Sequence, residues 1–465
     1  MVSFYNKINM SIVNFIENYK KRKRVLFTTP SHSQGDFVAP LSNKLIGSKF
    51  FSCDFSEIDG FDNLANPTGI IRSAQEDAAA IYGSKSTFFL TNGSTSGVVA
   101  AMYSVLNRND KVVIARNCHK SVYNGLVLTG AVPIWLMPGY NSEWGIYDSL
   151  NLNYIEELLY KNKDVKAVII TNPTYEGVMF DISRISAICK KYNAILIVDE
   201  AHGALWHFHK ALGTPSLLQG ADIVIQSLHK TTGALNPSAL LHIGWESAVD
   251  PKNVQQALNL ITTTSPSYPL LLNIEATINC LASKKGQLYI QNYIKKLGRL
   301  IRSLKTIPNL EIYSVNNDIT KILVKVTNMP GFELSHIMSE KYGIEDELAN
   351  EKSVLYLTGI GTSDTKLKKL EKALFDLCDN NILLVQGKSK YDALACVEPR
   401  MRYTPAALWG KYAKEVDIQH ALARVSMELI ADYPPGVPIL LPGEVIKKEH
   451  IDYLSDTRKK IKVLA

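Results

Sequence analysis

Apolar runs and helix-like patterns alternate along the chain from about residue 50 to residue 244. The runs are short and rich in β-branched residues, as buried strands are. They cover residues 87–90, 111–115, 133–136, 165–171, 194–199, 222–226 and 239–243. Between them, apolar positions recur at helical spacing over residues 70–82, 96–106, 121–129, 152–160 and 182–192. This alternation predicts an α/β fold, in which helices cover both faces of a mostly parallel sheet.

The pattern changes after the turn-rich stretch TSPSYP at residues 264–269. A long helical region is predicted at about 270–307. It is followed by a second, smaller α/β unit with strands near 310–314, 319–326 and 354–357 and a helix near 366–379. The stretch YPPGVPILLPGE at 433–444 is too rich in proline for a helix, which indicates a packed loop. We expect an N-terminal helical segment at 1–45, a cofactor-binding large domain at 46–275, a small α/β domain at 276–385 and a C-terminal segment at 386–465.

Composition narrows the class of protein. Hydrophobic residues make up 46% and charged residues 20% of the 465 positions, as in ordinary globular proteins. No apolar run reaches membrane-spanning length, and the N-terminus lacks the apolar core of a signal peptide. Six dispersed cysteines without a Cys-x-x-Cys pair fit free thiols in the cytoplasm. We therefore expect a cytoplasmic protein with no membrane partner.

The net charge of +7 is modest, and its densest part is the run KKRKR at residues 20–24. Such a run can bind nucleic acid or act as a targeting signal. Here it follows apolar residues at helical spacing, Ile12, Phe15, Ile16 and Tyr19. Basic residues stabilise the last turn of a helix through its dipole. A solvated helix end is therefore the preferred interpretation, without a nucleic-acid partner.

The stretch QSLHKTTG at residues 226–233 carries the most informative candidate chemistry. It places Lys230 just past a predicted buried strand, where open α/β sheets bind their ligands. A lysine in a partly desolvated pocket has a lowered pKa and can act as a nucleophile that forms a Schiff base. In isolation, however, a surface lysine would be the commoner meaning of this pattern.

Three other predicted strands also end in residues with chemical capacity. Gly93, Ser94 and Thr95 follow the first strand and would open a helix, where backbone N–H groups favour an anion. His119 follows the second strand. Asp199 ends a buried run, where a carboxylate is costly unless it meets a cation or a metal.

Histidines near Asp199 raise the possibility of a zinc site formed by His202, His207 and His209. The cluster lacks clear ligand spacing and a cysteine partner. We therefore expect no metal, and a cationic nitrogen heterocycle is the better partner for Asp199.

Together, the strand ends provide an anion cradle, an imidazole that can stack on a ring, an acid for a ring nitrogen and a reactive amine. Pyridoxal 5'-phosphate needs these groups, and its chemistry is the withdrawal of electrons from the substrate α-carbon. An ionised Asp199 would keep the pyridine nitrogen protonated. The chain order is informative because the loop, His119, Asp199 and Lys230 follow one another, the last two 31 residues apart.

With these residues the chain resembles the bacterial ornithine/lysine/arginine decarboxylases in their short form, which use pyridoxal phosphate and have the aspartate-aminotransferase-like fold (fold type I). The resemblance extends from about Pro30 through Glu444. Its carriers are DGFDNL (59–64), TNGSTSG (91–97), ARNCHKS (115–121), TNPTYEGVMFD (171–181), DEAHG (199–203), QSLHKTTGAL (226–235), TSPSYP (264–269) and YPPGVPILLPGE (433–444).

The resemblance implies a role for each candidate residue. Lys230 would be the Schiff-base lysine, Asp199 the partner of the pyridine nitrogen and His119 the residue stacked on the ring. The remaining cofactor contacts would come from Gly93, Ser94, Thr95, Ser227 and His229 near the phosphate and from Ala201 and His202 at the ring. Thr264 and Ser265 would reach the phosphate in the neighbouring subunit, since sites of this family form at a dimer interface.

The expected reaction is the decarboxylation of a basic L-amino acid, whether arginine, lysine or ornithine, to the corresponding amine and CO₂. The catalytic residues would be Lys230, His119, Asp199 and His202. Glu347 is a candidate acid for the distal cation of the substrate, although an exposed carboxylate is an equal possibility. An aminotransferase on the same fold remains an alternative, because Arg400, Arg402 and Arg424 could hold the α-carboxylate. A non-catalytic regulatory homologue is a further one.

Overall fold

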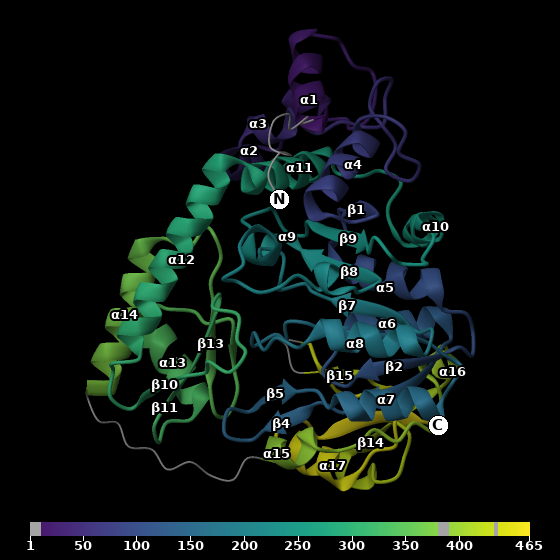
Figure 1. Cartoon of the computed structure of the whole chain (residues 1–465), viewed down its shortest axis with the longest axis vertical. Coiled ribbons are helices and arrows are strands. Elements are labelled where there is room, and N and C mark those ends of the chain that lie inside the picture. The colour runs from purple at the N-terminus through teal and green to yellow at the C-terminus, as the bar shows by residue number, and fades with distance from the viewer. Residues whose placement is uncertain (1–10, 380–389, 432–435) are drawn as a thin grey trace.

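A seven-stranded sheet forms the centre of the computed structural model, which describes residues 11–379, 390–431 and 436–465 (Figure 1). Its order is β1-β9-β8-β7-β6-β2-β3. The strands are β1 (Ser86–Leu90), β2 (Lys111–Ala115), β3 (Val132–Leu136), β6 (Val165–Thr171), β7 (Ile195–Asp199), β8 (Ile223–Ser227) and β9 (Ala239–Ile243). All neighbouring pairs are parallel except those of β9, which runs antiparallel to β1 and β8. The predicted α/β fold with a mostly parallel sheet is confirmed.

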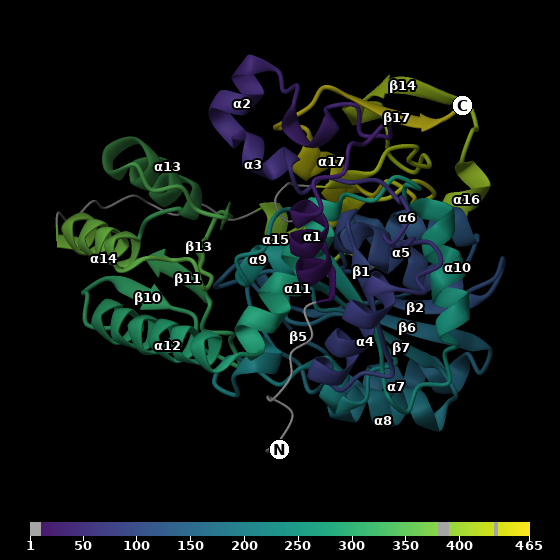
Figure 2. The ribbon, with the colours of Figure 1, turned by 90° about the horizontal axis from the view of Figure 1, so that it is seen from above.

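Helices cover both faces of this sheet (Figure 2). One face packs against α4 (Ile70–Tyr82), α7 (Leu152–Lys161) and α8 (Ile182–Lys191), and the other against α5 (Gly93–Val105), α6 (Lys120–Thr129) and α10 (Pro251–Ile261). Alternate residues of one strand enter the two cores, as Leu196 and Ile197 of β7 do. Because both faces are buried, the strands read as continuous apolar runs rather than alternating ones.

The long helical region predicted after the sheet is two helices, α11 (Tyr268–Ala282) and α12 (Lys284–Leu304). They meet at Ser283, whose hydroxyl accepts a hydrogen bond from the Gly286 N–H at 3.0 Å and caps α12. A Cβ atom at Gly286 would lie 1.8 Å from the carbonyl oxygen of Cys280. Only glycine fits this bend, which the helical pattern on either side conceals.

The second, smaller α/β unit forms a four-stranded antiparallel sheet of order β10-β11-β13-β12. Its strands are β10 (Leu310–Ile312), β11 (Lys321–Val326), β12 (Leu348–Ala349) and β13 (Val354–Leu357). Helices α12, α14 (Asp364–Asp379) and α13 (Gly331–Tyr342) accompany it at the left of Figure 1. The sequence predicted this unit but neither α13 nor the hairpin of β4 (Gly139–Asn141) and β5 (Ile146–Ser149).

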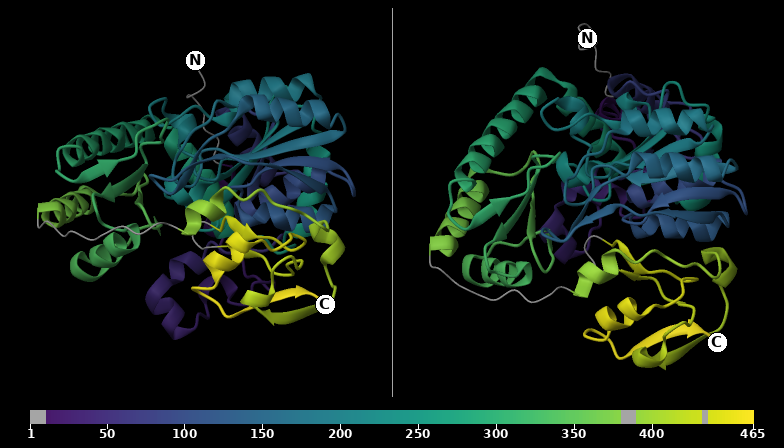
Figure 3. Two further views of the ribbon diagram at one scale, coloured as in Figure 1. Left: turned by 90° about the horizontal axis from the view of Figure 1, so that it is seen from below. Right: turned by 60° about the horizontal axis from the view of Figure 1, so that its bottom comes forward.

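The C-terminal part lies beside the large sheet with its own apolar cluster (Figure 3). It contains α15 (Lys390–Ala395), α16 (Pro405–Leu408) and α17 (Lys448–Leu454), the pair β14 (Ala413–Asp417) and β17 (Lys460–Leu464), and the pair β15 (Ile430–Ala431) and β16 (Pro438–Leu440). The prediction of a loop at 433–444 was wrong for the residues of β16. A proline begins this strand, a position at which proline is tolerated. Residues 432–435 and the predicted boundary at 385–386 lie outside the described residues.

A buried ion pair fixes this C-terminal part to the sheet. Arg116, just past β2, donates to Glu444 at 3.2 Å and to the carbonyl of Ile439 at 3.0 Å, with both charged side chains at most 6% exposed. The N–H of Lys120 donates to the carbonyl of Gly436 at 3.1 Å. The segment from Gly436 onward is thereby held at the carboxyl end of β2.

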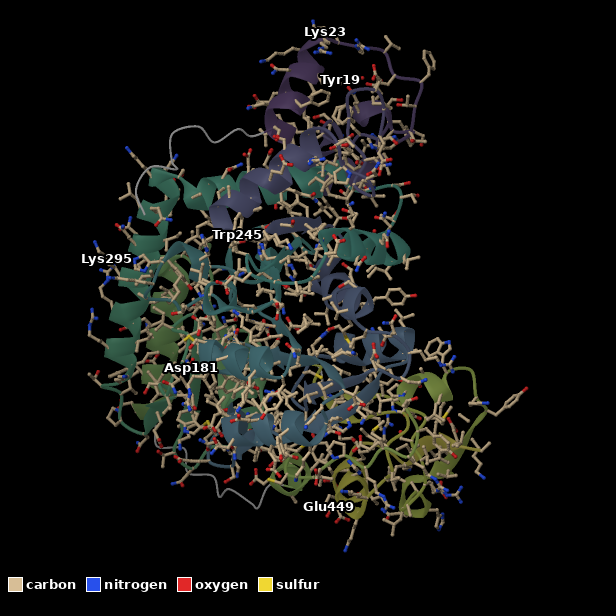
Figure 4. The ribbon with its side chains drawn as sticks, turned by 45° about the vertical axis from the view of Figure 1, so that its right-hand side comes forward. Tyr19, Lys23, Asp181, Trp245, Lys295 and Glu449 are labelled. Carbon is tan, nitrogen blue, oxygen red and sulfur yellow. The ribbon has the colours of Figure 1, made fainter. Side chains whose placement is uncertain are left out.

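At the N-terminus, α1 (Ser11–Lys21) has Lys20 and Lys21 in its last turn, which confirms the helix end predicted for the basic run. Tyr19, labelled in Figure 4, packs edge-on against Phe55 and Phe61. Short helices α2 (Pro40–Ile46) and α3 (Ser48–Phe51) follow. No helix within the described ranges is long and apolar enough to cross a membrane. The domain boundaries at 45 and 275 stay predictions.

Candidate active site

The carboxyl ends of the parallel strands meet at one edge of the large sheet, as parallel topology requires. Residues just past these ends line a cavity of about 530 Å³. The predicted site residues that line it are Gly93, Ser94, Thr95, His119, Asp199, Ala201, His202, His229 and Lys230. Residues spread over more than 130 positions of sequence thus converge on one space.

The first turn of α5 forms one end of this cavity. The helix begins at Gly93, three residues before the predicted start, and Gly93 itself has a φ of +74°, which residues other than glycine rarely adopt. Ser227, fully buried at the end of β8, donates through its hydroxyl to the Ser94 hydroxyl at 2.8 Å. Free N–H groups at a helix start favour an anion. The hydroxyls of Ser94 and Thr95 belong to the same turn.

Asp199 ends β7 as a buried carboxylate that is 5% exposed. Its Oδ1 atom accepts a hydrogen bond from the Ala201 N–H at 3.1 Å. The following turn brings Ala201 and His202 to the cavity wall. A buried carboxylate is stabilised by a cation, so the surroundings of Asp199 suit a protonated ring nitrogen.

Lys230 lies in α9 (Leu228–Thr231), the short helix after β8. Its Nζ atom is 3.0 Å from Nε2 of His202. Burial lowers the pKa of the Lys230 amine. The carboxylates of Asp199 and Glu347 raise this pKa, and the Lys321 ammonium lowers it. Burial, reinforced by the charges of Lys230 and Lys321, holds the pKa of His202 well below its ordinary range. A neutral imidazole therefore faces an amine whose pKa is lowered.

The other two cavity histidines are oriented through their Nδ1 atoms. His119 caps α6, and its Nδ1 accepts from the Ser121 N–H at 3.2 Å, so the proton of the neutral ring is on Nε2. Burial lowers the pKa of His119. Nδ1 of His229 lies 3.0 Å from the carbonyl oxygen of Ser238, which makes Nδ1 the donor. Nε2 of a neutral His229 is therefore an acceptor.

The three histidines considered for zinc are separated. His202 is in the cavity, whereas the His207 ring packs against Tyr82 with ring centroids 4.8 Å apart. His209 accepts from the Ala211 N–H at 3.2 Å. Across residues 11–379, 390–431 and 436–465, no group of three or more His, Cys, Asp or Glu side chains is arranged to hold a metal ion.

Comparison with known proteins places this cavity in a family context. Residues 12–322 match the Orn/Lys/Arg decarboxylase major domain, and residues 388–464 match the Orn/Lys/Arg decarboxylase C-terminal domain. The chain belongs to the Orn/Lys/Arg decarboxylase family. It is thus an amino-acid decarboxylase, and the predicted membership and enzyme class are confirmed.

Individual relatives extend over nearly the whole chain. The arginine decarboxylase of Halalkalibacterium halodurans is 30% identical over 452 residues, which cover 95% of this chain and 92% of that protein. The constitutive lysine decarboxylase of Escherichia coli is 25% identical and is covered over 76% of its length. The solved lysine decarboxylase of Francisella novicida superimposes with a TM-score of 0.84 at 21% identity, covering 99% of this chain and 82% of the other. These likenesses confirm the fold predicted for the decarboxylase.

Two further residues line the cavity of this decarboxylase: Tyr175, to which the sequence assigned no role, and Glu347, the candidate acid for the distal cation. Tyr175 follows β6, and Glu347 precedes β12 in the small sheet. The Tyr175 hydroxyl donates to Glu347, and its ring packs edge-on against His202 with centroids 4.6 Å apart. The motif TNPTYEGVMFD contained Tyr175 without indicating its role. Only the folding of one unit against the other brings Glu347 to Lys230.

Thr264 and Ser265 do not line the cavity of their own chain. They are exposed in the link between α10 and α11. Ser265 is held through its N–H, which donates to the Thr263 hydroxyl at 3.0 Å. Their expected contact with a neighbouring subunit stays a prediction.

Proposed function

We propose that this decarboxylase removes CO₂ from a basic L-amino acid, arginine, lysine or ornithine, and releases the corresponding di- or polyamine. The observation that carries the proposal is one cavity that contains both Lys230 and Glu347. Lys230 provides a reactive amine at the sheet edge, and Glu347 provides a carboxylate from the small sheet. A substrate with an α-amino group and a distal cation fits these two chemical ends.

The cavity fits pyridoxal 5'-phosphate as the cofactor. Lys230 would hold its aldehyde carbon, Asp199 a proton on the ring nitrogen and His119 one face of the ring. The phosphate would bind at the start of α5, near Ser94, Thr95, Ser227 and His229, because that turn favours anions. When bound, the cofactor supplies a ring that withdraws the electron pair left at the α-carbon.

Glu347 and Tyr175 would hold the distal end of the substrate. The Tyr175 hydroxyl donates to Glu347, which fixes the orientation of the carboxylate. A hydrogen bond to a charged group contributes roughly 1.5–3 kcal/mol. Glu347 would thus favour the binding of basic amino acids.

The positions of three arginines favour decarboxylation over transamination. An aminotransferase holds the α-carboxylate, whereas a decarboxylase must leave it free to depart. Arg400 and Arg402 line a different cavity in the C-terminal part. Nε of Arg424 donates to the carbonyl of His420 at 3.1 Å. These candidate carboxylate ligands thus lie away from Lys230 in this chain.

We further infer a cytoplasmic homodimer with shared sites that acts in polyamine biosynthesis. The six cysteines are free thiols, which suits a reducing compartment. The exposed Thr264 and Ser265 would complete the phosphate site of the second subunit. A two-fold dimer supplies this contact reciprocally.

The first prediction concerns attachment of the cofactor. The purified protein is expected to be yellow, and borohydride reduction followed by peptide mapping should find the cofactor on Lys230, because burial favours its neutral, nucleophilic amine. Lys230→Ala should lose both the colour and the trapped peptide, whereas the control Lys210→Ala keeps them. Recovery of the reduced cofactor on Lys120 or Lys210 would contradict the assignment.

The second prediction concerns Asp199. Asp199→Asn should keep the cofactor but lower kcat about a hundredfold, because an amide cannot hold the ring-nitrogen proton by charge; such electrostatic effects are on the order of 3 kcal/mol. Steady-state kinetics and the absorption spectrum are the measurements. A near-normal turnover would refute this role.

The third prediction concerns substrate choice. Incubation with a panel of amino acids, with products identified by mass, should give an amine and CO₂ from a basic amino acid. Glu347→Gln should lower kcat/KM for that substrate by about tenfold to a hundredfold, since one charged contact is lost. Glu345→Gln changes an exposed carboxylate two residues away and serves as the control. Equal losses in both variants would argue against a role in recognition, and formation of a keto acid would indicate transamination.

The fourth prediction concerns assembly. A Lys230→Ala chain and a Thr264→Ala/Ser265→Ala chain, each inactive or weak alone, should regain activity when mixed into heterodimers, because one of the two sites then carries no lesion. Mixing Lys230→Ala with Asp199→Asn is the control, since both lesions lie in the same cavity and no intact site results. Heterodimers of the first pair that stay inactive would show that each site forms within one chain.

A further inference from the structure

A fully buried ion pair lies between the small sheet and the turn that carries His202. Lys321, the first residue of β11, and Asp318 are 0% and 1% exposed, and their charged atoms are 2.8 Å apart. The Lys321 ammonium also donates to the backbone carbonyl of His202 at 2.7 Å. Nε1 of Trp206 donates to the same Asp318 oxygen at 2.8 Å. One buried cation therefore joins the second sheet to the turn after Asp199.

From this turn the contact continues to the reactive amine. Nε2 of the His202 ring lies 3.0 Å from Nζ of Lys230, and the side of the ring is packed against Tyr175. The carbonyl that Lys321 holds and the imidazole that meets Lys230 belong to one residue. A displacement of Lys321 would therefore shift the imidazole relative to the amine.

A glycine, Gly177, leaves room for Lys321 at this place. Gly177 has a φ of +105°, and a Cβ atom there would lie 2.8 Å from Cβ of Lys321. The N–H of Asp318 donates to the carbonyl of Gly177 at 2.8 Å. The loop that carries Tyr175 thus closes directly over the ion pair.

Stability alone gives no reason to bury this pair. Removing two charges from water costs several kcal/mol for each ion, and an uncharged pair of similar volume is often as stable. We propose that Lys321, held by Asp318, is a positioning residue of the decarboxylase, which fixes the His202 carbonyl and thereby sets the imidazole against Lys230. The inference rests on the proposed role of Lys230 and adds to it the residue that aligns its neighbour.

The charge of Lys321 supports the same positioning role as its contacts do. Burial is the main cause of the lowered pKa of both Lys230 and His202, and the charge of Lys321 adds to it. The titratable and charged groups around the Lys230 amine are His119, Asp199, His202, His229, Lys321 and Glu347. Without Lys321, its ammonium would no longer oppose the effect of the Asp199 and Glu347 carboxylates, which raise the pKa of Lys230. A larger share of Lys230 would then be protonated at neutral pH.

The test is the double variant Lys321→Met/Asp318→Asn, which leaves no buried charge without its partner. Lys230 reactivity is read in the full-length chain after removal of the cofactor, by limited acetylation and peptide mass, with the exposed Lys210 as internal reference. We expect the acetylation rate of Lys230 at neutral pH to fall about tenfold, the size of effect that one nearby charge can have. In the cofactor-loaded enzyme, kcat should fall similarly while KM changes less.

Lys325→Met is the matched control, because Lys325 lies on the same strand but pairs with Glu143 and Glu311. It should leave both readouts unchanged. A folded double variant with wild-type Lys230 reactivity and kcat overturns the proposal, whatever its melting temperature. A double variant that does not fold also overturns it, since the pair would then serve stability. Lys230 acetylation is measured without substrate, so a failure of the substrate proposal remains distinguishable.

Discussion

The parallel pairing of β7 with β8 is the constraint on which the site depends. It sets Asp199 opposite Ile225. The turn after β7 then places His202 at the cavity, and the short helix after β8 places Lys230 at the same cavity. Buried hydrogen bonds also hold the turn after Asp199. Glu200, fully buried, accepts from the Ser216 N–H and the Gln226 side chain, both at 2.6 Å. Burial raises the pKa of Glu200 to about 7. Backbone geometry and buried polar contacts together hold the carboxylate of Asp199 and the amine of Lys230 at the same cavity.

The parts of the chain outside the large sheet close the cavity instead of forming separate sites. The small sheet contributes Glu347 directly and, through Lys321, holds the carbonyl of His202. The C-terminal part brings Val437 to the cavity wall next to the segment that Arg116 and Glu444 anchor. Displacement of either part would thus expose the same amine and carboxylate to water, where their interaction weakens.

The strands and the residues that follow them could be predicted from sequence because both signals are local. The runs at 111–115, 165–171 and 239–243 agree with β2, β6 and β9 to the residue. The candidate residues at the strand ends lie around one cavity, since parallel topology leaves them little choice. Lys321 carries no such signal, and for Glu347 the sequence left an exposed carboxylate equally possible. A lysine that begins an apolar strand is usually solvated, and only contacts across more than 100 positions reveal it as fully buried. The break at Ser283 was hidden for a related reason, because Gly286 fits a close approach that helical periodicity does not encode.

The charges within the cavity give a physical argument for a basic substrate. Burial lowers the pKa values of His119, His202 and His229, which leaves these rings uncharged near neutrality. The Lys230 amine is likewise shifted toward its neutral form. The same cavity contains two carboxylates, Asp199 and Glu347. In the proposed function, a protonated ring nitrogen would pair with the first, and a positive group on the substrate would pair with the second. A neutral amino acid would leave Glu347 partly desolvated, with the Tyr175 hydroxyl as a hydrogen-bond donor but no substrate cation beside it, which would weaken binding.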